Sequence, residues 1–165
     1  MSKDLNDFLE DFQSLTISSL DENKLPFSSY APFVKNEASY YVYISNMAKH
    51  TQNLRNNDKC SLFFIEDESK CKNIFARKRV SIQCNAKEIN KDCDYEETIL
   101  EIFEEKFSKE MVQMLRKMND FYIFEFTPYY GEAVFGFGQA YNLGGENFDQ
   151  LVQREGTKGH GHSSK

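Results

Sequence analysis

This sequence lacks the features that would tie it to a membrane, a secretory pathway or a nucleic acid. Its apolar runs, such as residues 61–65 (SLFFI), have the length of a strand and are far too short to span a bilayer. The N-terminal segment MSKDLNDFLEDF has no apolar stretch of the kind found in secretory signals. The net charge of −6 argues against nucleic acid as a partner, because phosphate binding needs a positive surface. An anionic small ligand would therefore need a local basic patch.

Paired cysteines are also absent. The four cysteines are Cys60, Cys71, Cys84 and Cys93. They form no CxxC pair and show no metal-ligand spacing. We therefore expect scattered, reduced thiols in a cytoplasmic protein.

Few residues are available for catalysis. The sequence has three histidines and no GxSxG, HExxH or P-loop string. The glycines of residues 136–140 (GFGQA) do not form a dinucleotide-binding motif, because no helix is expected after them. We interpret them as kinks in a strand.

Aromatic and β-branched residues, often alternating with polar ones, predict six or seven strands. They lie at residues 15–20, 25–34, 38–45, 59–67, 80–89, 121–128 and 133–143. Residues 21–24 (DENK) form a turn, and Pro26 and Pro32 should push the second strand to an edge or a bulge.

Helical spacing of apolar residues predicts short helices around these strands. They cover residues 4–13, 48–56 and 95–118, the last broken into two helices near Ser108. The methionine stripe of the last helix is expected to pack in the core; its members are Met111, Met114 and Met118. Together these elements predict a mainly β (α+β) protein, a small antiparallel barrel with peripheral helices. We expect one domain over residues 1–150, followed by a flexible tail over residues 151–165.

The densest positive charge lies in residues 75–79 (FARKR), which contain Arg77, Lys78 and Arg79. Such a segment can clamp a carboxylate or a phosphate, because the guanidinium of arginine pairs with both oxygens of these groups. It can equally be a solvated charge run before a strand. The residues alone leave both interpretations open.

The histidines have functional and structural interpretations of the same kind. His50, with Ser45 and Thr51 nearby, could bind a phosphate at the start of a helix, or could serve as a surface capping residue. His160 and His162 are two residues apart, so both can face one side and bind haem iron or a metal ion. The alternative is a histidine-bearing tail without a ligand.

Several strings resemble, in order, the HugZ-type haem-utilisation proteins, which are related to the pyridoxamine 5'-phosphate oxidase split barrel. These strings are SYAPFV, YYVYIS followed by AKHTQNL, FIEDES, FARKRV, MNDF and FGQAYNL. The resemblance spans residues 15–162. It implies a homodimer of six-stranded split barrels with haem at the dimer interface.

The resemblance also implies roles for particular residues. The stretch GTKGHGH is similar to a Gly-x-Lys-Gly-x-x-His pattern, which assigns the axial iron ligand to His162, with His160 as the alternative. Lys78 and especially Arg79 match positions that meet haem on its other side. Asp120, in MNDF, matches an acidic residue that hydrogen-bonds the axial histidine.

The implied activity is that of a haem-degrading monooxygenase that releases iron, serves iron acquisition and takes electrons from an external reductase. One alternative is an FMN-binding oxidoreductase, in which Arg79, Lys78, Ser45, His50 and Thr51 would surround the phosphate. Another is a non-enzymatic protein that stores or transfers haem.

Overall fold

Antiparallel pairing joins eight strands into one sheet within residues 3–154, the part of the chain that the computed structural model describes. The strands are β1 (Ser14–Leu20), β2 (Pro26–Asn36), β3 (Ser39–Ser45), β4 (Lys59–Ile65), β5 (Arg79–Glu88), β6 (Phe121–Val134), β7 (Ala140–Gly144) and β8 (Gln150–Gln153). The helices are α1 (Lys3–Glu10), α2 (Lys49–Asn56), α3 (Asp94–Lys106) and α4 (Lys109–Lys117), with 3₁₀ turns at Glu68–Lys70 and Ile74–Ala76. No helix in this part of the chain is long and apolar enough to cross a membrane.

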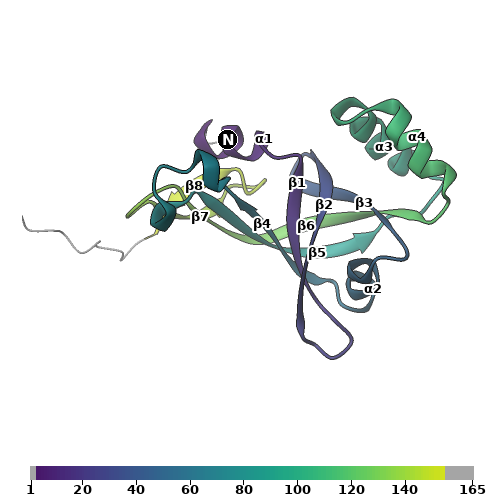
Figure 1. Ribbon diagram of the computed structural model, residues 1–165, viewed down its shortest axis with the longest axis horizontal. Helices are drawn as coiled ribbons and strands as arrows, with labels where there is room; N and C mark the ends of the chain where they lie inside the picture. The colour runs from purple at the N-terminus through teal and green to yellow at the C-terminus, as the bar shows by residue number, and fades with distance from the viewer. Residues whose placement is uncertain (1–2, 155–165) are drawn as a thin grey trace, which may run out of the picture.

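Six of the strands close into a barrel. The sheet order is β3-β2-β1-β4-β5-β6-β7-β8, and an additional pairing of β3 with β6 closes the ring over β1 to β6. Figure 1 shows the helical pair α3–α4 at one end of the long β6 strand and β7 and β8 at the other. The expected six-stranded antiparallel barrel with peripheral helices is confirmed.

The barrel is split because β6 changes partner along one edge. Its first residues, 121–126, pair with β3, whereas residues 132–134 pair with β7. Pro128, which has no N–H to donate, lies between these two pairings. The register with β5 shifts between Gln83 and Cys84, opposite Tyr130 and Pro128, so a bulge bends β6 at the same place.

Proline has a similar position in β2. Residues 26–32 of this strand pair with β1, and residues 33–36 pair with β3. Pro32 is the last residue of the first pairing, and its side without an N–H faces no strand in the described structure. The expectation that the prolines push the whole strand to an edge or a bulge is wrong, because β2 lies between β1 and β3 in the sheet and its pairing with β1 has no bulge. Both prolines lie in the stretch of β2 that pairs with β1 alone.

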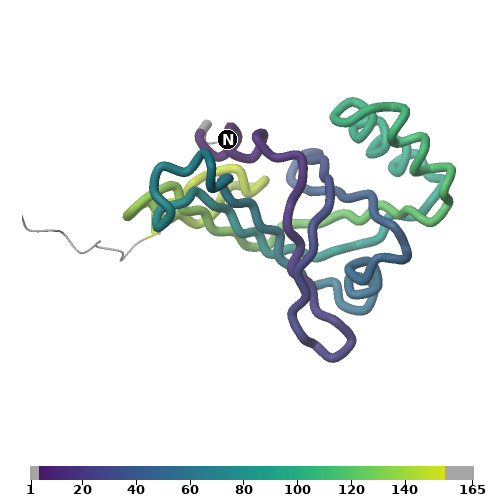
Figure 2. The backbone as a smooth tube through the Cα atoms, in the orientation of Figure 1, coloured from purple at the N-terminus to yellow at the C-terminus, as the bar shows by residue number. Residues whose placement is uncertain are grey.

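Two apolar clusters hold the elements together. The barrel interior contains Ile17, Leu62 and Ile82, each fully buried, and α1 closes one end of it with Leu5, Phe8 and Leu9. The second cluster packs α3 and α4 on the outside of β3 and β6 and includes Ile99, Phe103, Val112 and Ile123. The path of the chain around both clusters can be followed in Figure 2.

The predicted break between α3 and α4 is confirmed. Ser108 is the N-cap of α4, where its hydroxyl accepts a hydrogen bond from the Met111 N–H at 3.2 Å. The prediction that the methionine stripe packs in the core is wrong, because Met111, Met114 and Met118 are each about half exposed. The fully buried residue of α4 is Val112, so the helix packs on a face beside the stripe.

Two further details differ from the sequence-based expectations. The glycines of residues 136–140 form the turn between β6 and β7 instead of kinking a strand, and Gly138 has a φ of 69°, which favours glycine. Strand β8 was not expected, because the apolar periodicity ends near Gly144. It begins at residue 150, the expected end of the folded domain.

Candidate functional site

The candidate site residues fall into two groups at opposite ends of the β5–β6 ribbon. Ser45 pairs with Phe121 at the start of β6, whereas Arg79 pairs with Val134 at its end. The thirteen residue steps between these positions span about 43 Å along an extended strand. Figure 1 shows the two ends far apart, with α2 near one and β7 and β8 near the other. One copy of the chain therefore does not bring all the predicted residues into one site.

The first group is built around Asp120. The Ser45 hydroxyl donates a hydrogen bond to Asp120 Oδ2 at 2.7 Å, and Ser45 Oγ accepts one from the Met47 N–H at 3.1 Å. The Thr51 hydroxyl donates to the Ser45 carbonyl oxygen at 2.6 Å. The hydroxyl hydrogens of Ser45 and Thr51 are both used within the protein, so this turn offers fewer donors for an FMN phosphate than its sequence suggests.

His50 points away from this group. Its Nδ1 lies 3.0 Å from the Ser29 hydroxyl of β2, and burial lowers the pKa of the imidazole below its ordinary value. The structure thus joins His50 to the β1–β2 hairpin. It does not bring His50 together with the basic segment.

The buried imidazole of His50 has a consequence for stability. Because its pKa is lower in the folded state, the unfolded chain takes up this proton first, and stability falls as the pH drops below about 6.5. We expect the free energy of unfolding of His50→Gln, measured by urea denaturation, to fall less steeply between pH 7 and pH 5 than that of the wild type. His160→Gln is the matched control and should keep the wild-type slope. An unchanged slope in His50→Gln would contradict this assignment.

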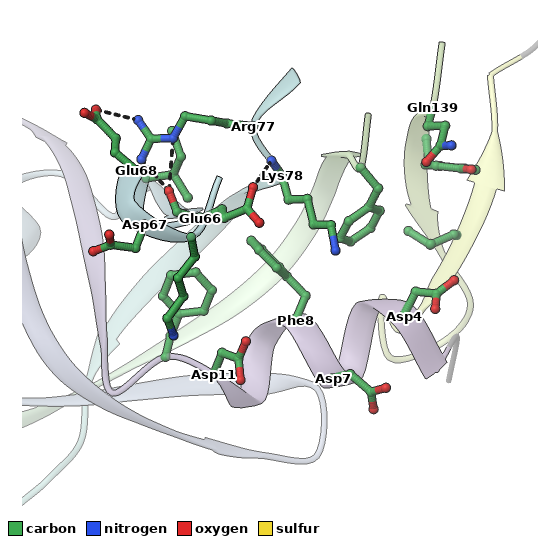
Figure 3. A pocket seen from close by; sticks show the side chains of 16 residues that line it. Asp4, Asp7, Phe8, Asp11, Glu66, Asp67, Glu68, Arg77, Lys78 and Gln139 are labelled. Atoms are coloured by element: carbon green, nitrogen blue, oxygen red, sulfur yellow. Dashed lines mark hydrogen bonds and ion pairs between the residues drawn. The ribbon is translucent and has the colours of Figure 1, made fainter. Parts of the chain in front are cut away.

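The second group is the basic segment, whose three side chains point in different directions. Arg77 donates from Nη1 to Glu68 at 2.9 Å and from Nε to the Glu66 carbonyl oxygen at 3.0 Å. Figure 3 shows Arg77 turned toward Glu68, while Lys78 points into a cleft. Arg79 donates from Nη1 to the Arg77 carbonyl oxygen at 3.1 Å and pairs with no carboxylate among residues 3–154. Of these three basic residues, Arg79 is the one that lies outside the cleft and has no carboxylate partner within the described part of the chain.

The cleft beside Lys78 is acidic. It has a volume of about 920 Å³ and lies between α1 and the segment that joins β4 to β5. Its charged lining residues are Asp4, Asp7, Asp11, Glu66, Asp67, Glu68, Lys70, Arg77 and Lys78. Six carboxylates against three cations make this cleft unfavourable for an anionic ligand. The basic segment therefore does not form the three-residue anion clamp that its sequence suggests.

Arg79 borders an outer sheet face that the sequence-based reasoning missed. One cross-strand row on this face runs Tyr30, Thr16, Phe63 and Ser81, and the row beside it runs Ser28, Ser18, Ser61 and Gln83. None of these eight residues is charged, although 28% of the whole sequence is. On β6 the first row continues with Glu132, whose carboxylate is paired with Arg154, and the second with Tyr130. Depletion of charge is typical of the centre of protein interfaces. The signal was present in the sequence as uncharged residues at alternating positions: Ser14, Thr16 and Ser18 in SLTISSL, and Ser61 and Phe63 in KCSLFFI.

His160 and His162 lie outside the described residues. Within residues 3–154, no group of three or more His, Cys, Asp or Glu side chains could hold a metal ion. Cys60 and Cys84 are buried, and burial raises the pKa of the Cys60 thiol to about 12.

Comparisons with known proteins agree with this architecture. The family model of pyridoxamine 5'-phosphate oxidase matches residues 1–135. The haem oxygenase HutZ of Vibrio cholerae is 34% identical over 155 residues, which cover 94% of this chain and 88% of HutZ. The crystal structure of HutZ, described there as a haem storage protein, matches with a TM-score of 0.74 and 32% identity over 78% of this chain and 89% of that one.

A second solved structure matches over more of the chain. ChuZ of Campylobacter jejuni has a TM-score of 0.81 and 32% identity over 92% of this chain, which spans 61% of the ChuZ chain. A haem-binding protein of Mycobacterium smegmatis shares the fold at 16% identity, with a TM-score of 0.75 over 89% of this chain and 59% of that one. The chain belongs to the pyridoxamine 5'-phosphate oxidase family of split-barrel proteins, among the relatives of HutZ and ChuZ.

Proposed function

We propose that two copies of this chain bind haem between them and degrade it oxidatively, releasing iron. The observation that carries the proposal is the uncharged sheet face bordered by Arg79. The identity of 34% with a haem oxygenase supports the same ligand. The acidic cleft is an unfavourable place for haem, because its six carboxylates would repel the two propionates of the ligand. This leaves the sheet face as the better candidate for the haem site.

The residues at the sheet face fit a haem group. Tyr30 is 71% exposed and Phe63 lies two strands away on the same row, so aromatic surface is available for the apolar ring. Arg79 supplies an uncompensated guanidinium for anionic groups of the ligand. Haem itself supplies the iron that activates oxygen and the ring that is cleaved, with electrons from an external reductase.

A second copy is needed because of the reach of the C-terminal tail. Eight residue steps separate Arg154, the last described residue, from His162, and they span at most about 29 Å. Arg154 pairs with Glu132 of β6, and the twelve residue steps from Glu132 back to Asp120 span about 40 Å along the strand. We therefore assign the Asp120 that meets His162 to the partner copy, with Arg79 and the tail of one chain facing the Asp120 end of the other.

Within this site each residue has a defined task. His162 is the proposed iron ligand through one imidazole nitrogen. Asp120 would accept a hydrogen bond from the other nitrogen, which fixes the tautomer and raises the basicity of the ligand. Arg79 would hold the opposite side of the ligand by hydrogen bonds and charge. Lys78 points into the acidic cleft and is expected to contribute less than Arg79.

Titration with haemin followed by a reductant tests the function. We expect a Soret band that saturates at a fixed stoichiometry and no yellow flavin in the purified protein. Adding ascorbate or a reductase should then remove the Soret band, open the ring and release iron to a chelator. Catalase and free haemin without protein are the controls for peroxide-driven bleaching.

The same experiment separates the alternatives. Storage of haem is a specific second candidate, because the HutZ structure is described as that of a storage protein. A Soret band that persists under reductant and oxygen would favour storage. Binding of FMN in place of haem would contradict both proposals.

A further inference from the structure

Ser45 holds the Asp120 carboxylate from the end of β3. The register of β3 and β6 places Ser45 opposite Phe121, so the hydroxyl reaches the preceding residue, Asp120. Because Ser45 Oγ also accepts the Met47 N–H, its single hydrogen is left to point at the carboxylate. The hydrogen bond of 2.7 Å has the length of a charge-assisted O–H···O⁻ contact.

The backbone around Asp120 is fixed independently of its side chain. Asn119 ends α4 with a φ of 59°, and its carbonyl oxygen accepts a hydrogen bond from Lys91 Nζ at 2.8 Å. The Asp120 carbonyl oxygen accepts the Asn46 N–H at 2.7 Å. These contacts fix the position of the Asp120 backbone, and the hydrogen bond from the Ser45 hydroxyl fixes the orientation of the Asp120 side chain.

The carboxylate keeps most of its acceptor capacity free. A carboxylate has about four lone-pair positions, and within residues 3–154 the Ser45 hydroxyl is the one side-chain donor found at Asp120. No cation of the described chain forms an ion pair with it. A half-buried carboxylate that is oriented but not neutralised is suited to accept a hydrogen bond from a donor outside the chain.

The Ser45 backbone is anchored in turn by α2. Thr51 is fully buried and donates its hydroxyl hydrogen to the Ser45 carbonyl oxygen at 2.6 Å. Thr51, Ser45 and Asp120 thus form a chain of hydrogen bonds that connects α2, the end of β3 and the start of β6.

We infer that Ser45 is a positioning residue for the proposed haem site, acting through Asp120 on the axial histidine. This inference rests on the proposed function and replaces the phosphate-binding role that the sequence suggested for Ser45. When Ser45 is absent, Asp120 loses its oriented rotamer, and the histidine N–H loses an aligned acceptor.

The iron–histidine stretching band of the ferrous haem complex, measured by resonance Raman, tests the inference. We expect Ser45→Ala to shift this band in the same direction as Asp120→Asn, by a smaller amount, and to weaken haem binding about 5-fold, below the 10- to 100-fold typical of direct partners of a ligand. Ser45→Thr keeps the hydroxyl and should restore the wild-type band. In an Asp120→Asn background, Ser45→Ala should add no further shift.

Other outcomes would overturn the inference in distinguishable ways. A wild-type band in Ser45→Ala, while Asp120→Asn is shifted, would show that the hydroxyl does not position the carboxylate. An added shift in the Asp120→Asn background would show that Ser45 acts by another route. If His162→Ala also kept the wild-type band, the ligand assignment itself would fail, and this inference with it. Unchanged thermal unfolding of the ligand-free variants would exclude a loss of fold as the cause.

Discussion

Replacing His162 by alanine is expected to weaken haemin binding more than about 100-fold and to remove the spectrum of a histidine-ligated haem. The reason is that an axial imidazole supplies the strongest single bond between the protein and the iron, and losing even an indirect partner of such a ligand costs 10- to 100-fold. The measurement is a haemin titration followed through the Soret band, in the ferric and ferrous states.

His160→Ala is the matched control, because it removes an imidazole two residues away in the same tail. It should change the affinity less than about 2-fold, within the range expected for an uninvolved residue. The reverse pattern, with loss in His160→Ala alone, would move the ligand to His160. Wild-type binding in both variants would exclude a tail histidine as the ligand.

Placing a carboxylate on the uncharged sheet face should prevent both dimerisation and haem binding. Phe63 lies between Thr16 and Ser81 in the middle of the row, so in a two-fold dimer Phe63→Glu buries two unpaired charges at an effective penalty of several kcal/mol each. We expect a monomer in sedimentation velocity and a loss of haemin affinity of at least about 10-fold. The affinity falls because Arg79 and the Asp120 of the partner copy are no longer brought together.

Gln113→Glu introduces the same charge on the exposed surface of α4 and is the control. It should leave both the oligomeric state and the haemin affinity unchanged. A dimeric Phe63→Glu that binds haemin normally would show that this sheet face is not the interface. A monomeric Phe63→Glu that still binds haemin normally would show that one copy completes the site.

The basic segment illustrates why a charged motif is hard to interpret before its surroundings are known. Arg77, Lys78 and Arg79 are consecutive, but successive residues near a strand point to opposite sides. Arg77 is neutralised by Glu68, and Lys78 faces the six carboxylates of the cleft. The charge of Arg79 is the one left for a ligand, and the resemblance to haem-utilisation proteins had already emphasised this residue.

Local signals in the sequence were sufficient for most of the secondary structure. The break at Ser108 could be predicted because an N-cap depends on a hydroxyl and the three residues that follow it. The methionine stripe was misjudged because helical spacing shows that a face is apolar but not what covers it. Strand β8 was missed because its four residues gain hydrogen bonds only when β7 lies beside them.

The sequence by itself determined the mainly β class and the order of the strands along the chain, because apolar periodicity and capping act over a few neighbouring residues. The residues expected to meet haem came from the resemblance to the HugZ-type proteins. Only the tertiary structure decided that β3 and β7 share one edge of β6 and that Ser45 holds Asp120. It also decided that Arg79 and Asp120 lie at opposite ends of the barrel. These relations depend on strand register and long-range pairing: Arg79 and Val134 are 55 positions apart in the chain, Ser45 and Asp120 are 75 apart, and the pairs of β3 with β6 are 76 to 86 apart. That separation within one copy is the physical reason for proposing a site shared by two.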